Sequence, residues 1–122
     1  MDAAEEIEHH LAVLGTDAER TGPDRWRLLA ECAGLPLSIE LALRGALLRS
    51  EAAVLPPGTI APRQLLFWNA QAPLVCFAEN REGEVIVCGE IPVRALDPEL
   101  LDRFLGLLHA SAARAREFVL PA

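Results

Sequence analysis

Lysine and tyrosine are missing from this chain of 122 residues, and aromatic residues make up only 5% of it. All 11 basic residues are therefore arginines, and they face 18 acidic residues, which gives a net charge of −7. Contact with nucleic-acid phosphates requires a positive surface, and so does docking on anionic lipid. The acidic balance argues against both, so we expect neither nucleic acid nor a membrane as a direct partner.

Long hydrophobic runs and a leader-like segment are also missing. No stretch reaches the roughly 18 uncharged apolar residues that a membrane-spanning helix needs, and residues 2–6 are acidic rather than basic and apolar. The cysteines Cys32, Cys76 and Cys88 are odd in number and lack paired spacing, unlike a secreted disulfide framework. We expect a cytoplasmic protein that forms one domain over residues 1–122.

Apolar residues make up 52% of the chain and can supply the core of such a domain. Three segments predict helices. Asp2 is a suitable N-cap for residues 2–14, Pro62 stands at the start of residues 62–70, and Asp97-Pro98 begins a long final helix. Leu100, Phe104, Leu107, Leu108 and Ala115 are predicted to form the buried stripe of the last helix. Asp102, Arg103, Arg114 and Arg116 are predicted to be solvated.

Alternating apolar and polar residues predict strands at residues 25–32, 37–44 and 46–54. The third of these is also compatible with a helix, because Ala, Leu, Arg and Glu favour helices. Residues 16–24 are polar and contain Gly22-Pro23, which indicates a loop. The predicted fold is α+β, with the order α-β-β-β-α-β-β-α and helices packed on a mainly antiparallel sheet.

The last two strands form a hairpin around Arg81-Glu82-Gly83, with Gly83 in the left-handed conformation. This turn places Cys76 opposite Cys88, and it puts Phe77 on the other face of the hairpin. Both faces are largely apolar. We expect helices to cover one face, and a further helix or a partner to cover the other.

No motif in the sequence indicates catalysis, a cofactor or a metal. His9 and His10 are adjacent and would point about 100° apart on a helix, so they cannot chelate one ion. The glutamates around the hairpin favour a solvated acidic rim, although a metal or a basic partner is an alternative. Cys76 and Cys88 could form a disulfide, but reduced core thiols are favoured for the expected compartment.

Several short motifs resemble the YbjN family, which shares the architecture of type III secretion chaperones. They are the helix end at residues 65–69 (Leu-Leu-Phe-Trp-Asn), the strand at 73–77, the segment Glu-Ile-Pro-Val at 90–93 and the helix start at 97–101. The resemblance covers about residues 65–118. It implies a non-enzymatic binding protein, since secretion chaperones are acidic homodimers that hold an extended client segment on apolar surface.

We therefore predict a chaperone-like or regulatory homodimer that binds an unidentified protein client. The predicted partner surface consists of Leu37, Ile39, Leu41, Leu65, Trp68 and Phe77. One alternative is a small ligand-binding or enzymatic domain with a pocket between the sheet and the C-terminal helix. Another is a structural subunit of a larger assembly.

Overall fold

The computed structural model describes residues 1–119, so the last three residues of the predicted domain lie outside it. The helices are α1 (Ala3–Val13), α2 (Pro62–Asn69) and α3 (Pro98–Val119), with a 3₁₀ turn η1 (Val93–Ala95) before α3. The strands are β1 (Ala18–Gly22), β2 (Arg25–Cys32), β3 (Leu35–Arg44), β4 (Leu47–Leu55), β5 (Val75–Glu79) and β6 (Val85–Pro92).

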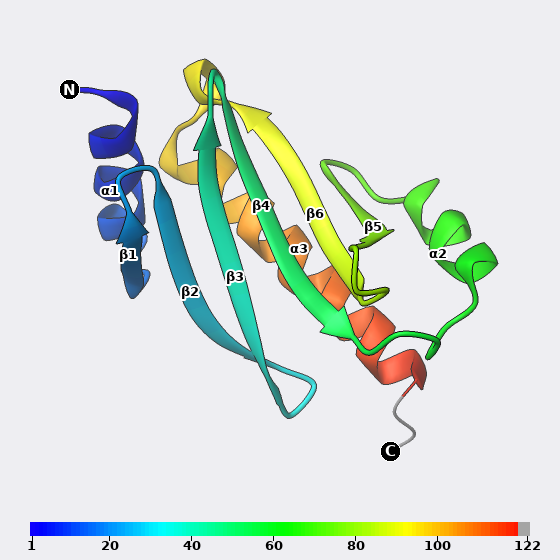
Figure 1. Ribbon diagram of the computed structural model, residues 1–122. Helices are drawn as coiled ribbons and strands as arrows, with labels where there is room; N and C mark the ends of the chain where they lie inside the picture. Colours follow the sequence, from blue (N-terminus) through cyan, green and yellow to red (C-terminus); the bar gives the residue numbers. More distant parts are fainter. Residues whose placement is uncertain (120–122) are drawn as a thin grey trace.

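The strands form one antiparallel sheet in the order β1-β2-β3-β4-β6-β5. Helix α3 runs across one face of this sheet, α1 lies beside β1 and β2, and α2 stands beyond the β5 edge (Figure 1). The core lies between α3 and the sheet, where Phe104, Leu108 and Ala112 are completely buried. The predicted fold class, helices on a mainly antiparallel sheet, is confirmed.

The strands predicted from alternation are all present. Strand β4, whose residues also favour helix, pairs with β3 on one side and β6 on the other. Leu48, Ser50 and Ala52 point into the core, while the residues between them are more exposed. Two paired neighbours and a buried face therefore outweigh the helix propensity of this segment.

The expected loop at residues 16–24 is wrong, because residues 18–22 form the edge strand β1. It pairs with β2 through Ala18 opposite Leu28 and Arg20 opposite Trp26. Its three central residues are exposed, so the strand carries no apolar alternation that a sequence could reveal. The observed order of elements is accordingly α-β-β-β-β-α-β-β-α.

The hairpin of β5 and β6 has the predicted register. Cys76 is opposite Cys88 and Ala78 is opposite Ile86. Gly83 has a φ of 81°, in the left-handed region that the turn requires. The hairpin register therefore followed from the position of one glycine.

The predicted helix starts are confirmed. Asp2 caps α1 by accepting a hydrogen bond from the Glu5 backbone N–H at 2.8 Å, and Asp97 does the same for Leu100 at 2.7 Å. In α2, Pro62 occupies the first turn as expected. These local signals fix where each helix begins.

The predicted stripe of α3 needs three corrections. Leu101, not Leu100, is fully buried, because the stripe follows spacings of three and four residues through Phe104, Leu108 and Ala112. Leu107, which was expected in the stripe, lies beside it and is only half-buried. Arg116 continues this stripe one turn further on and is only 5% exposed, whereas it was expected to be solvated. Its neighbour Arg114 is exposed, as predicted.

Arg116 is buried against backbone carbonyl oxygens. Its Nε donates to Val54 at 3.0 Å, Nη1 donates to Cys32 at 3.0 Å and to Leu35 at 3.2 Å, and Nη2 donates to Pro36 at 3.0 Å. The fork of donors on a guanidinium suits several acceptors at once. This one side chain therefore ties α3 to the β2–β3 turn and to the end of β4.

Candidate protein-binding surfaces

The six residues predicted to form a partner surface are buried in the single chain. Their exposed fractions are 1% for Leu37, 4% for Ile39, 1% for Leu41, 5% for Leu65, 4% for Trp68 and 6% for Phe77. The first three lie on the core face of β3, and the other three belong to α2 and β5. These positions are core in the single chain, so an exposed partner surface has to come from their neighbours.

Trp68 anchors α2 to the rest of the molecule. Its ring centroid lies 5.4 Å from that of Phe77 on β5 and 5.3 Å from that of Phe118 on α3. The guanidinium of Arg114 lies over the same ring at 5.1 Å, in cation–π geometry. Strand β5, α2 and the last turns of α3 therefore meet at one side chain.

Asn69 closes part of the free edge of β5. Its side-chain amide donates to the Phe77 carbonyl at 3.0 Å, and its Oδ1 accepts from the Phe77 backbone N–H at 2.6 Å. The amide thus takes the place of a neighbouring strand at this residue and removes two groups that another chain could pair with. The Asn at the helix end in the YbjN-like motif has this structural role here.

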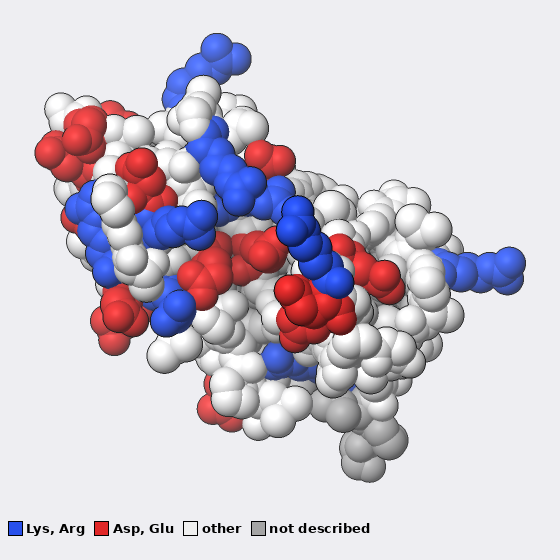
Figure 2. Space-filling model, viewed as in Figure 1, with Lys and Arg blue, Asp and Glu red and all other residues white. Residues whose placement is uncertain are grey.

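The outer side of α2 is the most apolar exposed part of a helix in residues 1–119. Leu66 is 68% exposed, Phe67 is 58% exposed, and Leu74 in the loop before β5 is 40% exposed. We call these three residues the α2 surface. Figure 2 shows few charged side chains over this end of the molecule.

Hollows lie on both sides of α2. One, of about 200 Å³, lies between Leu65 and Leu66 of α2 and Phe77 and Ala78 of β5. The other, of about 610 Å³, lies between α2 and α3 and includes Trp68 and Phe118. A partner seated on the α2 surface therefore has recesses for side chains on both sides of the helix.

The sheet face opposite α3 is largely charged over β2 to β4, so the two apolar faces expected for the hairpin do not extend to the rest of the sheet. Arg27 contacts Glu40 at 2.9 Å, and Arg49 contacts both Glu51 and Glu90 at 3.5 Å. The hydrogen bond and the charge of Glu40 raise the pKa of Arg27. Blue and red side chains alternate over these strands in Figure 2.

Only the β5–β6 end of this face is apolar, as the hairpin had indicated. Ile86 and Cys88 point to this side and are buried, whereas Cys76 is exposed. Strands β2 to β4 carry the charges because their outward positions are mainly Arg, Glu and Ser. The expectation was drawn from the hairpin alone and does not extend to the whole sheet.

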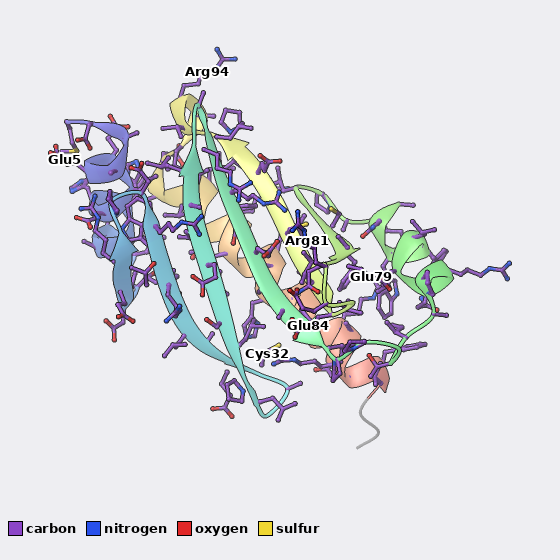
Figure 3. The ribbon with its side chains drawn as sticks, in the orientation of Figure 1. Glu5, Cys32, Glu79, Arg81, Glu84 and Arg94 are labelled. Atoms are coloured by element: carbon purple, nitrogen blue, oxygen red, sulfur yellow. The ribbon has the colours of Figure 1, made fainter. Side chains whose placement is uncertain are left out.

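Titratable residues do not assemble into a metal site in residues 1–119, where no three His, Cys, Asp or Glu side chains are grouped for one ion. His9 and His10 have ring centroids 5.9 Å apart. Glu79, Arg81 and Glu84 lie around the end of the β5–β6 hairpin (Figure 3), where Glu84 accepts a hydrogen bond from Asn80 at 3.0 Å.

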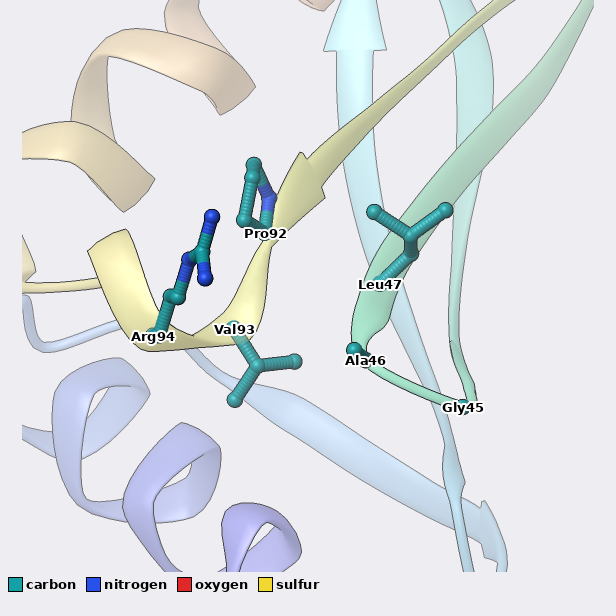
Figure 4. A pocket seen from close by; sticks show the side chains of 6 residues that line it. All are labelled: Gly45, Ala46, Leu47, Pro92, Val93 and Arg94. Atoms are coloured by element: carbon teal, nitrogen blue, oxygen red, sulfur yellow. The ribbon is translucent and has the colours of Figure 1, made fainter.

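A groove of about 580 Å³ lies at the other end of the sheet, between the β3–β4 turn and η1 (Figure 4). Its lining is mainly apolar, and one cation belongs to it. The lining residues are Gly45, Ala46, Leu47, Pro92, Val93 and Arg94. A hydrogen bond of 2.9 Å from the Val93 N–H to the Ala46 carbonyl joins its two walls.

The pocket that the enzymatic alternative requires, between the sheet and α3, is filled by side chains. Leu101, Phe104, Leu108, Ala112 and Ala115 of α3 all have 0% exposure. Convergent polar groups around a cavity would define a ligand site. The packing beneath α3 therefore counts against that alternative.

Sequence reasoning did not assign Leu66 and Phe67 to the partner surface, although the signal was present. In a helix of eight residues, burial of Leu65 and Trp68 at a spacing of three fixes one inward face. Leu66 and Phe67 then face outward. The apolar content of α2 was therefore visible in the sequence, but its exposed side was not separated from its buried side.

No protein-family model and no curated protein matches the chain. Solved structures do match it. A chain of the ExsC–ExsE complex has a TM-score of 0.74 at 17% identity, covering 100% of this chain and 99% of that one. A chain of the Yersinia pestis type III secretion chaperone SycH with a fragment of YscM2 has a TM-score of 0.69 at 13% identity, with 93% and 98% covered.

YbjN from E. coli matches as well, with a TM-score of 0.68 at 14% identity, over 93% of this chain and 91% of that one. The predicted resemblance is therefore confirmed at the level of the fold. None of the helices in residues 1–119 combines the length and apolar character that crossing a bilayer requires. The chain has the fold that type III secretion chaperones and YbjN share.

Proposed function

We propose that this chain is a non-enzymatic, cytoplasmic protein-binding module, chaperone-like or regulatory, formed by residues 1–122 as one domain. The observation that carries the proposal is the likeness, over 93–100% of the chain, to chains from structures of complexes, among them ExsC–ExsE and SycH with a fragment of YscM2. The exposed apolar side chains of α2 add physical support, because such patches mark contacts between proteins.

In this proposal the chain is a homodimer, and the α2 surface is the contact between the two copies. Leu66 and Phe67 project from a helix that Trp68 holds rigidly against β5 and α3. An aromatic anchor on a rigid element costs little entropy to dock. A stable dimer of this size would bury about 800 Å² on each copy.

In the same proposal, the client segment binds in the groove between the β3–β4 turn and η1. Leu47 is 37% exposed there, and Pro92 and Val93 form the opposite wall. Arg94 provides a positive charge at the rim of an otherwise apolar recess (Figure 4). This chemistry suits an extended segment with an apolar side chain next to an acidic one.

A capture experiment followed by calorimetry tests the client site. Tagged chain retains proteins from the native lysate, and each retained protein is then produced alone and titrated against wild-type, Leu47→Asp and Leu29→Asp. Leu29 is a matched control, since it is 76% exposed on the charged sheet face, away from the groove. We expect Leu47→Asp to raise the Kd at least about tenfold and Leu29→Asp to leave it unchanged. Equal weakening by both variants would refute the groove, and chemical conversion of a captured protein would refute the non-enzymatic role.

A further inference from the structure

Two thiols face each other across the β5–β6 hairpin. Cys76 on β5 is directly opposite Cys88 on β6, and their sulfur atoms are 3.9 Å apart. Both side chains lie on the sheet face that α3 does not cover. Neither has a role in the proposed dimer or client contact.

The backbone separation at this pair lies within the range that disulfides span. The N–H and C=O of Phe77 turn away from β6 and bind Asn69, so Phe77 and Val87 are a non-hydrogen-bonded pair. Because the two kinds of pair alternate, Cys76 and Cys88 are a hydrogen-bonded pair, with Cα atoms about 5.5 Å apart. Disulfides most often have Cα separations of about 5.5–6 Å. Closing the bond needs rotation of both side chains and a small approach of the two strands, because the Cβ atoms of a hydrogen-bonded pair lie farther apart than the roughly 3.5–4.5 Å of a disulfide.

The two thiols differ in access. Cys76 is exposed, whereas Cys88 is only 6% exposed. Burial, and then the neighbouring Cys76, raise the pKa of Cys88 to about 11. A small oxidant in solution thus meets Cys76 first, and Cys88 is protected from outside but lies within reach of Cys76.

We propose that Cys76 and Cys88 form a dithiol site that low-molecular-weight disulfides oxidise to an intramolecular disulfide. The Cys76 thiolate attacks one sulfur of the small disulfide, which forms a mixed disulfide and releases one thiolate. Cys88 then gives up its proton to that thiolate and attacks the Cys76 sulfur, which releases the second small thiolate. This thiolate takes a proton from solvent, which replaces the proton that Cys76 gave to solvent when its own thiolate formed. The protein loses two hydrogen atoms, and the small disulfide gains them as two thiols.

Cys32 provides an internal control. It is 1% exposed, and its sulfur donates to the His109 carbonyl at 3.7 Å. Burial raises the pKa of this thiol. We expect Cys32 to remain reduced in the folded protein under conditions that oxidise the pair.

Oxidised glutathione is the probe for the test. The reduced protein is incubated with it, denatured, alkylated and weighed by mass spectrometry with peptide mapping. Wild-type should lose two hydrogen atoms, hold no glutathione and keep one alkylatable thiol, Cys32. Cys88→Ser should stop at a stable adduct of one glutathione on Cys76, and Cys76→Ser should react at least about tenfold more slowly than wild-type.

Two outcomes would overturn the proposal. One is wild-type protein that keeps three alkylatable thiols under these conditions. The other is wild-type protein that ends as a stable glutathione adduct with Cys88 still free. The wild-type measurement decides the matter even if a serine variant does not fold, and circular dichroism before oxidation checks that each variant is folded.

Discussion

Arg116 is a buried cation whose partners are four backbone carbonyls rather than a carboxylate. Replacing it by Met keeps much of its volume but leaves buried carbonyl oxygens without a donor. An unsatisfied buried group costs about 1–3 kcal/mol, so we expect Arg116→Met to lower the free energy of unfolding by about 3 kcal/mol. Urea denaturation measures this loss.

Arg103→Met is the matched control, because Arg103 is exposed on the same helix. Its unfolding free energy should stay within about 0.5 kcal/mol of wild-type. Equal losses of unfolding free energy in the two variants would contradict the stabilising role given to the four hydrogen bonds of Arg116.

Ala33 is a non-glycine residue with a left-handed backbone conformation, so substitutions there should change stability. It has a φ of 52° and Gly34 has a φ of 78° in the two-residue turn between β2 and β3. Such turns favour Asn followed by Gly, because Asn tolerates the left-handed region better than Ala. Ala33→Asn should raise Tm by about 2–6 °C in calorimetry. Ala33→Val, with a branched side chain, should lower it, and a higher Tm for the Val variant would contradict this account.

The sequence predicted some single residues well and others wrongly, for physical reasons. Asp2 and Asp97 were identified because a cap acts within three residues of itself. Arg116 was missed because its acceptors come from segments 62 to 84 positions away in the chain. A local pattern cannot show those carbonyls.

At the scale of elements, Asn69 joins α2 to β5. Asn69→Ala would leave the N–H and C=O of Phe77 without their partners, and we expect a loss of about 2 kcal/mol in unfolding free energy. Amide hydrogen exchange at Phe77 should become faster in the same variant. Gln64→Ala, elsewhere on α2, should change neither quantity appreciably. Unchanged exchange at Phe77 in Asn69→Ala would contradict the proposed closing of the edge.

Strand existence and strand register were predictable where one face is buried. The alternation of apolar and polar residues was enough to predict β2 and β3, and Gly83 was enough to predict the register of β5 with β6. Strand β1 was not predictable, because in this exposed edge strand apolar residues do not recur at every second position. The pairing of β4 with β6 joins distant segments and appears only in the structure.

At the scale of the whole molecule, the apolar content of the chain is divided between one core and a few exposed patches. The sequence indicated that apolar side chains exceed what one sheet face needs, and it placed the excess on Leu37, Ile39 and Leu41. The structure buries these beneath α3 and leaves Leu66 and Phe67 outside. Tertiary packing, which no local pattern contains, decides which apolar residues remain exposed.

The proposed dimer is best tested by size-exclusion chromatography with multi-angle light scattering over micromolar concentrations. The account predicts a mass of twice 13.2 kDa for wild-type and for Leu29→Asp, and 13.2 kDa for the double variant Leu66→Asp/Phe67→Asp with its circular dichroism unchanged. Two buried carboxylates at the centre of a contact are too costly to dock. A wild-type mass of 13.2 kDa at every concentration would contradict the proposed homodimer. A double variant that stays dimeric would contradict the α2 surface as its contact.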